Sequence, residues 1–169
     1  MADTIINRVA ASALITFDLE KLYQIGIRHS IDLSQWLDQG LILKEKEFRA
    51  QLRAHDWSVY QDQFIALHSS TEAILPAWAS LLVTTYLQPF ARKVVFGNLK
   101  DLEVQLFAEE IHLLDLSPYK DQPVIIKGCS EKTVPQDAYV QLIAKLQPEV
   151  KSLFYGEACS SVPLYKKKK

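Results

Sequence analysis

From Phe64 onward, short apolar runs alternate with longer segments of helical periodicity, which is the pattern of parallel βαβ units. The apolar runs predict strands at residues 64–67, 94–96, 124–127 and 153–155. These runs are apolar on both faces, as strands are when helices cover both sides of their sheet. The pattern therefore predicts an α/β fold, a three-layer α/β/α sandwich with a mainly parallel sheet.

Three helices are predicted between these strands, at residues 75–88, 100–115 and 134–147. The first is apolar nearly all round. The other two carry an apolar stripe, as an amphipathic helix on a core does. The stripe residues are Leu102, Leu106, Phe107, Ile111 and Leu114 in the second helix, and Ala138, Leu142 and Leu146 in the third. Thr133 with Gln136 predicts a capping box at the start of the third helix.

The first sixty residues have a weaker pattern. Residues 13–20 predict an edge strand, residues 30–40 a short capped helix, and residues 44–57 an amphipathic helix with Phe48 and Leu52 inward. We interpret residues 1–63 as an N-terminal extension packed on the same sheet. The whole chain, residues 1–169, is predicted to be a single domain. After the extension it contains a first βαβ copy at residues 64–97, a linking helix at 98–122, and a second βαβ copy with a tail at 123–169.

An internal duplication is predicted by laying residues 65–97 over residues 124–156, at a constant offset of fifty-nine. Seven of the thirty-three aligned positions are identical, where average residue usage gives about two. Each copy has a proline at the start of its helix and the tripeptide LQP at its end. Independent βαβ units also converge on such punctuation, so convergence is the alternative explanation.

The two copies differ in the outer face of their helices. Trp78, Leu82 and Tyr86 in the first copy stand where the second has Asp137, Gln141 and Lys145. A face this apolar is expected to be covered. Either the N-terminal sixty residues or a second subunit covers it, and the second alternative predicts a homodimer.

Composition and charge narrow the class of protein. The chain has 169 residues, 49% of them hydrophobic, and a formal net charge of -1, which suits one core and gives no field for nucleic acid or an anionic membrane. The uncharged stretch 73–91 is interrupted by Pro76 and Pro89, so it predicts a buried helix and no membrane span. Two cysteines and no secretory leader predict a cytoplasmic protein.

Candidate chemistry lies after the predicted strands, because ligands bind beyond the carboxyl ends of parallel strands. Cys129 and Cys159 are the catalytic candidates, since a thiol near a helix N-terminus has a lowered pKa and favours the thiolate. His68, Ser70, Ser130 and Glu157 are the ligand-binding candidates, suited to holding a small anion. We expect all of them on one edge of the sheet.

Each candidate also has a structural explanation. Cys129 is also explained as a small buried hydrophobic residue at a strand end, and the serines are also explained as turn and cap residues. A metal site of His68 with both cysteines lacks the local ligand spacing of known zinc modules, so no metal is assigned. No GxGxxG, GxxxxGK[ST], GxSxG or HExxH motif occurs, which leaves the cofactor unknown and the question of enzyme activity open. The terminal KKKK predicts a solvated tail and no specific nucleic-acid partner.

Several motifs spread over the chain resemble a known family. They are FDLE, QGLILKEKEFR, HDWSVYQD, KVVFG, VIIKGC and YGEACSSVPLYK. They resemble an uncharacterised bacterial domain-of-unknown-function family of the Bacteroidetes type. The resemblance implies no enzymatic assignment. It does imply a gene neighbourhood shared with the sulfur-mobilisation system for iron–sulfur cluster assembly, and hence partners among iron–sulfur assembly proteins.

The sequence thus predicts a cytosolic protein that binds or assists other proteins without catalysis, and the resemblance implies a link to iron–sulfur cluster assembly. The alternative is a thiol-dependent enzyme or a sulfur or metal carrier that uses Cys129 and Cys159.

Overall fold

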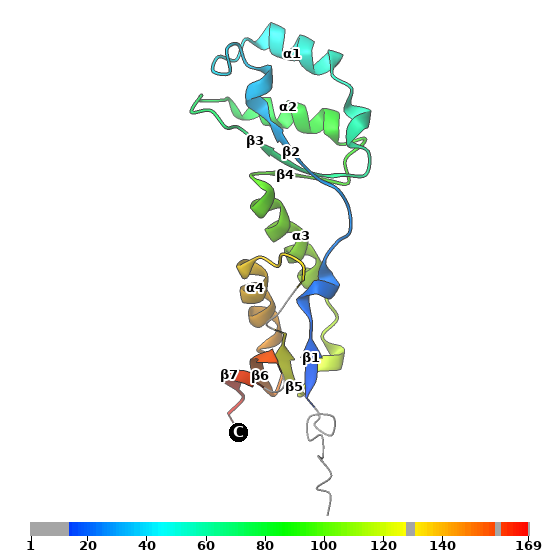
Figure 1. Ribbon diagram of the computed structural model, residues 1–169, viewed down its shortest axis with the longest axis vertical. Coiled ribbons are helices and arrows are strands. Elements are labelled where there is room, and N and C mark those ends of the chain that lie inside the picture. Colours follow the sequence, from blue (N-terminus) through cyan, green and yellow to red (C-terminus); the bar gives the residue numbers. More distant parts are fainter. Residues whose placement is uncertain (1–13, 128–130, 158–159, 169) are drawn as a thin grey trace, which may run out of the picture. The chain divides into compact units, whose positions relative to one another are not determined.

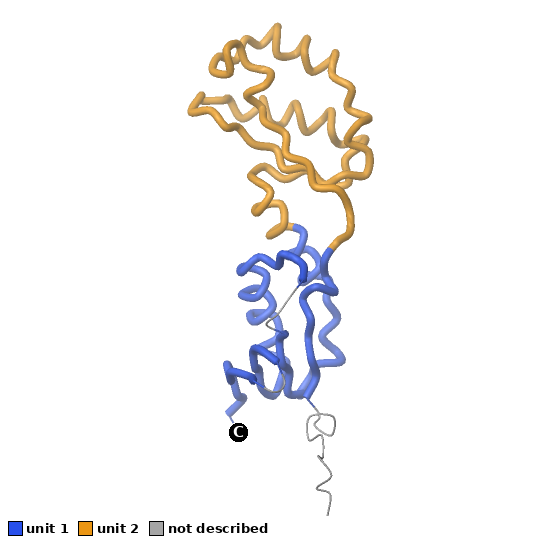
Figure 2. The backbone as a smooth tube through the Cα atoms, in the orientation of Figure 1, with its two compact units in different colours: residues 1–23, 106–169 blue, residues 24–105 orange. Residues whose placement is uncertain are grey.

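A computed structural model describes residues 14–127, 131–157 and 160–168 of the chain (Figure 1). The chain divides into two compact units, residues 1–23 with 106–169 and residues 24–105 (Figure 2). Each unit has its own sheet. The predicted α/β class and mainly parallel pairing are confirmed, but the strands form two sheets rather than one. The assignment of the whole chain to a single domain stays a prediction.

The unit of residues 24–105 contains a three-stranded parallel sheet in the order β2-β3-β4. One short 3-10 turn precedes helix α1, and another precedes strand β3. In chain order its elements are β2 (Arg28–Asp32), η2 (Leu33–Trp36), α1 (Glu45–Ala54), η3 (Trp57–Tyr60), β3 (Phe64–His68), α2 (Ala77–Leu87), β4 (Lys93–Phe96) and the start of α3 (Leu99–Leu113).

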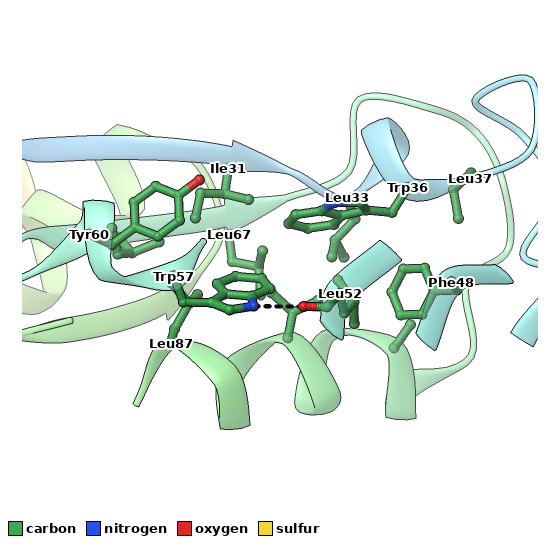
Figure 3. Packing of buried hydrophobic residues seen from close by; sticks show 13 residues of the cluster. Ile31, Leu33, Trp36, Leu37, Phe48, Leu52, Trp57, Tyr60, Leu67 and Leu87 are labelled. Atoms are coloured by element: carbon green, nitrogen blue, oxygen red, sulfur yellow. Dashed lines mark hydrogen bonds between the residues drawn. The ribbon is translucent and has the colours of Figure 1, made fainter. Parts of the chain in front are cut away.

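An aromatic core joins α1, η3 and α2 on one face of this sheet (Figure 3). Phe48 and Leu52 of α1 point into it and are fully buried, which confirms the inward positions predicted for them. The Trp57 indole Nε1 donates a hydrogen bond to the Leu52 carbonyl over 2.8 Å. This hydrogen bond satisfies the indole N–H, which needs a partner when it is buried in an apolar core.

The apolar outer face of α2 is covered from within the chain. The Trp78 ring lies 5.9 Å from the Phe48 ring, and the Tyr86 ring stacks on Trp57 at 5.4 Å. Of the two covers expected from the sequence, the N-terminal residues are the one observed. A homodimer stays a prediction, but the outer face of α2 no longer supports it.

The opposite face of the same sheet carries α3. Arg28 and Ile31 are three residues apart on β2, so they point to opposite faces, and Ile31 belongs to the core with α1 and α2. The Arg28 Nε donates to the Glu103 carboxylate of α3 over 2.7 Å. This sheet therefore has helices on both faces, as expected for a three-layer arrangement.

The unit of residues 1–23 with 106–169 contains a four-stranded sheet in the order β1-β5-β6-β7. The first three strands are parallel, and β7 is antiparallel to β6. Buried side chains of α3 and α4 pack on this sheet, among them Phe107 and Leu142. In chain order the further elements are β1 (Ile15–Phe17), η1 (Leu19–Leu22), η4 (Ser117–Tyr119), β5 (Pro123–Ile126), α4 (Gln136–Leu146), β6 (Ser152–Glu157) and β7 (Ser160–Lys166).

The same backbone contacts recur in the two units fifty-nine residues apart. Asp62 N donates to Phe90 O over 2.9 Å, and Asp121 N donates to Glu149 O over 2.8 Å. Both aspartates have left-handed backbone angles, with φ of 57° and 55°. The two units thus share one strand–helix–strand design. A common origin by duplication stays a prediction, because similar packing also produces similar turns.

Two local predictions are wrong. Residues 30–40 were expected to form a helix, but Ser30 to Asp32 complete β2 and only the 3-10 turn η2 follows, because the Asp32 side chain accepts from Ser34 N and starts that turn early. The Thr133–Gln136 capping box is also absent: the N-cap of α4 is Pro135, which makes no side-chain cap hydrogen bond.

The predicted N-terminal extension is part of both sheets. The edge strand expected within residues 13–20 is present as β1, which pairs with β5, while β2 pairs with β3 in the other sheet. Among the described residues, no helix is both long and apolar enough to cross a membrane, and α2, the helix of the uncharged stretch, has 11 residues.

Candidate functional site at the carboxyl ends of the strands

The predicted site residues do not share one edge of a sheet. His68 ends β3 and Ser70 follows it in the sheet β2-β3-β4, whereas Glu157 ends β6 of the other sheet. Cys129, Ser130 and Cys159 lie outside the described residues. The expected single edge is therefore replaced by two, one at the carboxyl ends of each sheet.

At the first edge, Asp32 ends β2 and gathers hydrogen bonds from two neighbouring loops. Its Oδ1 accepts from Ser34 N over 2.9 Å and from Ser70 N over 3.1 Å. Its Oδ2 accepts from the Ser70 hydroxyl. The two carboxylate oxygens thus fasten the loop after β3 to the end of β2.

These hydrogen bonds also fix the charge of Asp32. Partial burial by itself raises the pKa of Asp32, but the hydrogen bonds donated by Ser70 and Ser34 together outweigh it and hold the pKa well below its usual range. A carboxylate with such a low pKa is a weak base. Asp32 is therefore held ionised, and its hydrogen bonds with Ser34 and Ser70 stabilise the loop after β3.

At the second edge, Asp18 takes the corresponding place after β1. Its Oδ1 accepts from Glu20 N over 3.1 Å, and its Oδ2 accepts from the Lys127 ammonium, also over 3.1 Å. Lys127 follows β5, the neighbour of β1 in the sheet. An ion pair here replaces the hydroxyl contact found at the first edge.

Lys127 stands among several carboxylates. The hydrogen bond to Asp18 raises the pKa of Lys127. Desolvation opposes this effect, and the negative charges of Asp18, Glu20 and Glu157 raise the pKa further. The Glu20 carboxylate also accepts from Lys132 N over 2.6 Å, which ties the loop after β5 to η1. The second edge thus carries a fixed pattern of opposite charges.

The two cysteines follow strands of this second sheet in the sequence. Cys129 comes three residues after the end of β5, and Cys159 comes two residues after the end of β6. β5 and β6 are parallel neighbours, with Ile126 beside Tyr155. The strand adjacency that would let the two thiols act together is therefore present.

Sequence analysis missed Asp18 and Asp32. Each stands directly between one buried apolar residue and a buried leucine, in FDL and IDL, and each N-caps a 3-10 turn with its side chain. An aspartate between a strand and a buried leucine is the signal that was available, because aspartate side chains readily accept from the backbone two residues on.

A hollow of about 750 Å³ lies on the four-stranded sheet. Pro123 and Ser152, the first residues of β5 and β6, help to line it together with Phe154, Lys151 and Lys166. It is thus at the opposite ends of the strands from Lys127 and Glu157, and none of the described candidates His68, Ser70 and Glu157 lines it.

Comparison with known proteins gives one match. The family model described as "Protein of unknown function (DUF2480)" matches residues 3–167. No curated protein and no solved structure matches the chain.

Proposed function

We propose that this chain, which belongs to the DUF2480 family of unknown function, is a non-catalytic binding protein. Its binding surface in this proposal is the carboxyl edge of β1, β5 and β6. The surface comprises Asp18, Glu20, Lys127 and Glu157.

The observation that supports binding is the set of charged contacts at the second edge, where the Asp18 carboxylate accepts from the Lys127 ammonium over 3.1 Å and the Glu20 carboxylate accepts from Lys132 N over 2.6 Å. The pKa of Asp32 is moved down and that of Lys127 is moved up, each away from neutrality. Groups held in one charged state suit recognition of a charged partner, because complementary charge steers association and fixes orientation.

The proposed partners are proteins of the sulfur-mobilisation system that assembles iron–sulfur clusters, encountered in the cytoplasm. The support for this partner class is the gene neighbourhood implied by the resemblance of the chain to its family. The three carboxylates and one ammonium of the edge would select a partner with a complementary, mainly basic surface.

The test is direct binding of the purified chain to purified sulfur-mobilisation proteins by biolayer interferometry. We expect Glu157→Lys to weaken binding about tenfold, since reversing an interface charge adds like-charge repulsion. Glu157 is exposed at the end of β6, so the variant should fold. The matched control is Glu72→Lys, an exposed glutamate after β3 of the other sheet. Absence of binding, or equal loss in both variants, would contradict the proposal.

A thiol-dependent function is the second candidate, as an enzyme or a carrier of sulfur or metal through Cys129 and Cys159. Its support is that the two cysteines follow the neighbouring parallel strands β5 and β6. Lys127 stands two residues before Cys129, and a nearby cation favours a thiolate.

Alkylation by iodoacetamide as a function of pH tests this second candidate. Comparison of Cys129→Ser with Cys159→Ser assigns the rate to each thiol. A midpoint clearly below about 8.5, the value of a free thiol, is expected for a reactive cysteine. Midpoints at that value for both cysteines would leave the binding function alone.

A further inference from the structure

β4 is an edge strand of the sheet β2-β3-β4, since within the described residues it pairs only with β3 (Figure 1). Edge strands are usually protected by charge, proline or a covering segment, because their backbone groups readily pair with another strand. β4 has the sequence KVVF, which begins with one charged residue, Lys93, and contains no proline. Its last residue, Phe96, is 68% exposed.

A second exposed apolar residue belongs to the helix that precedes this strand. Leu81 of α2 is 64% exposed. A lone exposed leucine needs no explanation. Leu81 and Phe96, however, stand fifty-nine residues before Val140 and Tyr155, which line one groove of the other unit, so we treat them as a candidate interaction surface. We call Leu81, Phe96 and the β4 edge the β4 surface.

The other unit shows what such an edge can hold. Fifty-nine residues on, Val140 corresponds to Leu81 and Tyr155 to Phe96. Val140 and Tyr155 line a groove of about 400 Å³ together with Ile143 and with Leu164 of β7. β7 runs antiparallel along β6 there, with Val162 beside Tyr155. The edge that corresponds to β4 is thus already occupied by a strand of the same chain.

The correspondence extends to the end of the strand. After β7, Lys167 N donates to Lys151 O over 3.0 Å, and the Lys167 ammonium reaches the Asp121 carboxylate over 3.3 Å. Asp121 corresponds to Asp62, which has the same left-handed backbone angle and an exposed side chain. An incoming strand with a lysine in that place would find a carboxylate in Asp62.

From this we propose that β4 accepts an extended peptide strand of a partner protein, paired antiparallel as β7 is with β6. The strand carries two apolar residues, in the manner of Val162 and Leu164, followed by a lysine for Asp62. Backbone pairing supplies affinity in such strand addition, and the apolar side chains supply specificity. The β4 surface belongs to the other sheet from the edge proposed above, so either proposal can fail alone.

The probe is a capped synthetic peptide SSVPLYKKK, the sequence of residues 160–168. It is added to the intact chain and its binding is followed by fluorescence anisotropy of a labelled copy. We expect saturable binding of one peptide per chain. The peptide is not expected to displace β7, because a tethered strand has an effective concentration in the millimolar range.

Leu81→Ser should weaken the peptide about tenfold through the loss of buried apolar surface. Val140→Ser is the matched control: it removes an apolar residue of similar exposure, 59%, beside the edge that β7 fills, and should leave peptide affinity unchanged. Asp62→Asn, which keeps the left-handed angle accessible, should weaken the peptide about two- to threefold and reduce its salt dependence.

Failure of the peptide to bind at about 1 mM would overturn the proposal. Equal loss in Leu81→Ser and Val140→Ser would also overturn it, since the peptide would then be exchanging with β7. So would sedimentation equilibrium showing a dimer that Leu81→Ser dissociates, because the β4 surface would then bind a second copy of the chain.

Discussion

At the end of β2, the Asp32 carboxylate is satisfied by Ser70 and Ser34, whereas at the corresponding place after β1 the Asp18 carboxylate pairs with the Lys127 ammonium. The backbone around the two aspartates is nearly the same: each accepts from the N–H two residues ahead and N-caps a 3-10 turn. The end of the strand thus determines where the carboxylate lies. The side chain that follows the neighbouring strand of the sheet, Ser70 after β3 or Lys127 after β5, determines what the carboxylate binds. A hydroxyl leaves the carboxylate charge without a counterion among the described residues, as at Asp32, whereas an ammonium compensates it in an ion pair, as at Asp18.

The cores of the two units differ in a second way. Trp36, Trp57 and Trp78, the three tryptophans of the chain, all belong to the unit of residues 24–105. In that unit Tyr86 covers Trp57. Lys145, at the corresponding position of the other unit, instead donates to carbonyls at the end of α3. Tryptophan fluorescence therefore reports on one unit, while far-ultraviolet circular dichroism reports on both.

The largest effect is expected from the matched pair Phe48→Ala and Phe107→Ala. Both rings are buried, and each loss should lower the free energy of unfolding of its own unit by about 3–5 kcal/mol. In urea titrations, Phe48→Ala should shift the fluorescence midpoint, and Phe107→Ala should shift circular dichroism more than fluorescence. Identical shifts by both probes in both variants would show that the units unfold together and would break the comparison.

A smaller effect is expected from Lys145→Met. The Lys145 ammonium donates to the carbonyls of Ile111, His112 and Leu114 over 2.6, 2.6 and 3.0 Å, at the helix end where a cation is favourable. Methionine keeps the apolar stem but leaves these carbonyls without the donor. The free energy of unfolding should fall by about 1–3 kcal/mol, measured by circular dichroism in urea. Lys120→Met, at an exposed position, is the control and should change stability by less than about 0.5 kcal/mol.

The smallest effect concerns Asp32 and is visible as a pH dependence. The pKa of Asp32 in the folded chain lies below the unfolded value of about 3.9. Its contribution to stability is therefore complete above about pH 5 and is lost as the pH falls through the folded pKa. Asp32→Asn should lower the free energy of unfolding by about 1 kcal/mol at pH 7 and by less at pH 3.

Glu72→Gln serves as the control for the pH measurement, because Glu72 is exposed on the same unit. It should leave both the stability and its pH dependence unchanged. A difference between Asp32→Asn and the unaltered chain that is the same at pH 7 and pH 3 would mean that the hydrogen bonds of Asp32 do not depend on its charge.

Local pattern predicted the elements from Phe64 to Tyr155 well, because their apolar periodicity is strong and their ends carry proline or glycine. It missed β7 (Ser160–Lys166), which lies in the segment predicted as a tail. The strand expected at residues 64–67 is β3, and the helix expected at 134–147 is α4. The same approach failed at residues 30–40, where SIDLSQWL has a helix-like spacing of leucine and tryptophan. There, pairing of β2 with β3 outweighs local propensity, and the Asp32 cap starts a 3-10 turn instead.

The candidate site was predicted only in part. Placement of His68, Ser70 and Glu157 at strand ends is confirmed, because a side chain that follows a buried strand has to lie at its end. Their grouping on one edge was wrong, since no local signal says which strands pair. Asp18 and Asp32 were missed because their importance comes from Lys127 and Ser70, residues 109 and 38 positions away.

Sequence by itself determined that this chain alternates strands and helices, that its third and fourth helices are amphipathic, and that two of its segments share turns at a fixed spacing. Those features depend on neighbours within a few residues, and such neighbours are fixed by the chain. The division of the strands into two sheets was decided by tertiary packing. So was the pairing of β7 with the outer edge of β6, whereas within the described residues no strand pairs with the outer edge of β4. Strand pairing joins backbone groups that are alike in every residue, so the partner of a strand is selected by the packing of the whole unit.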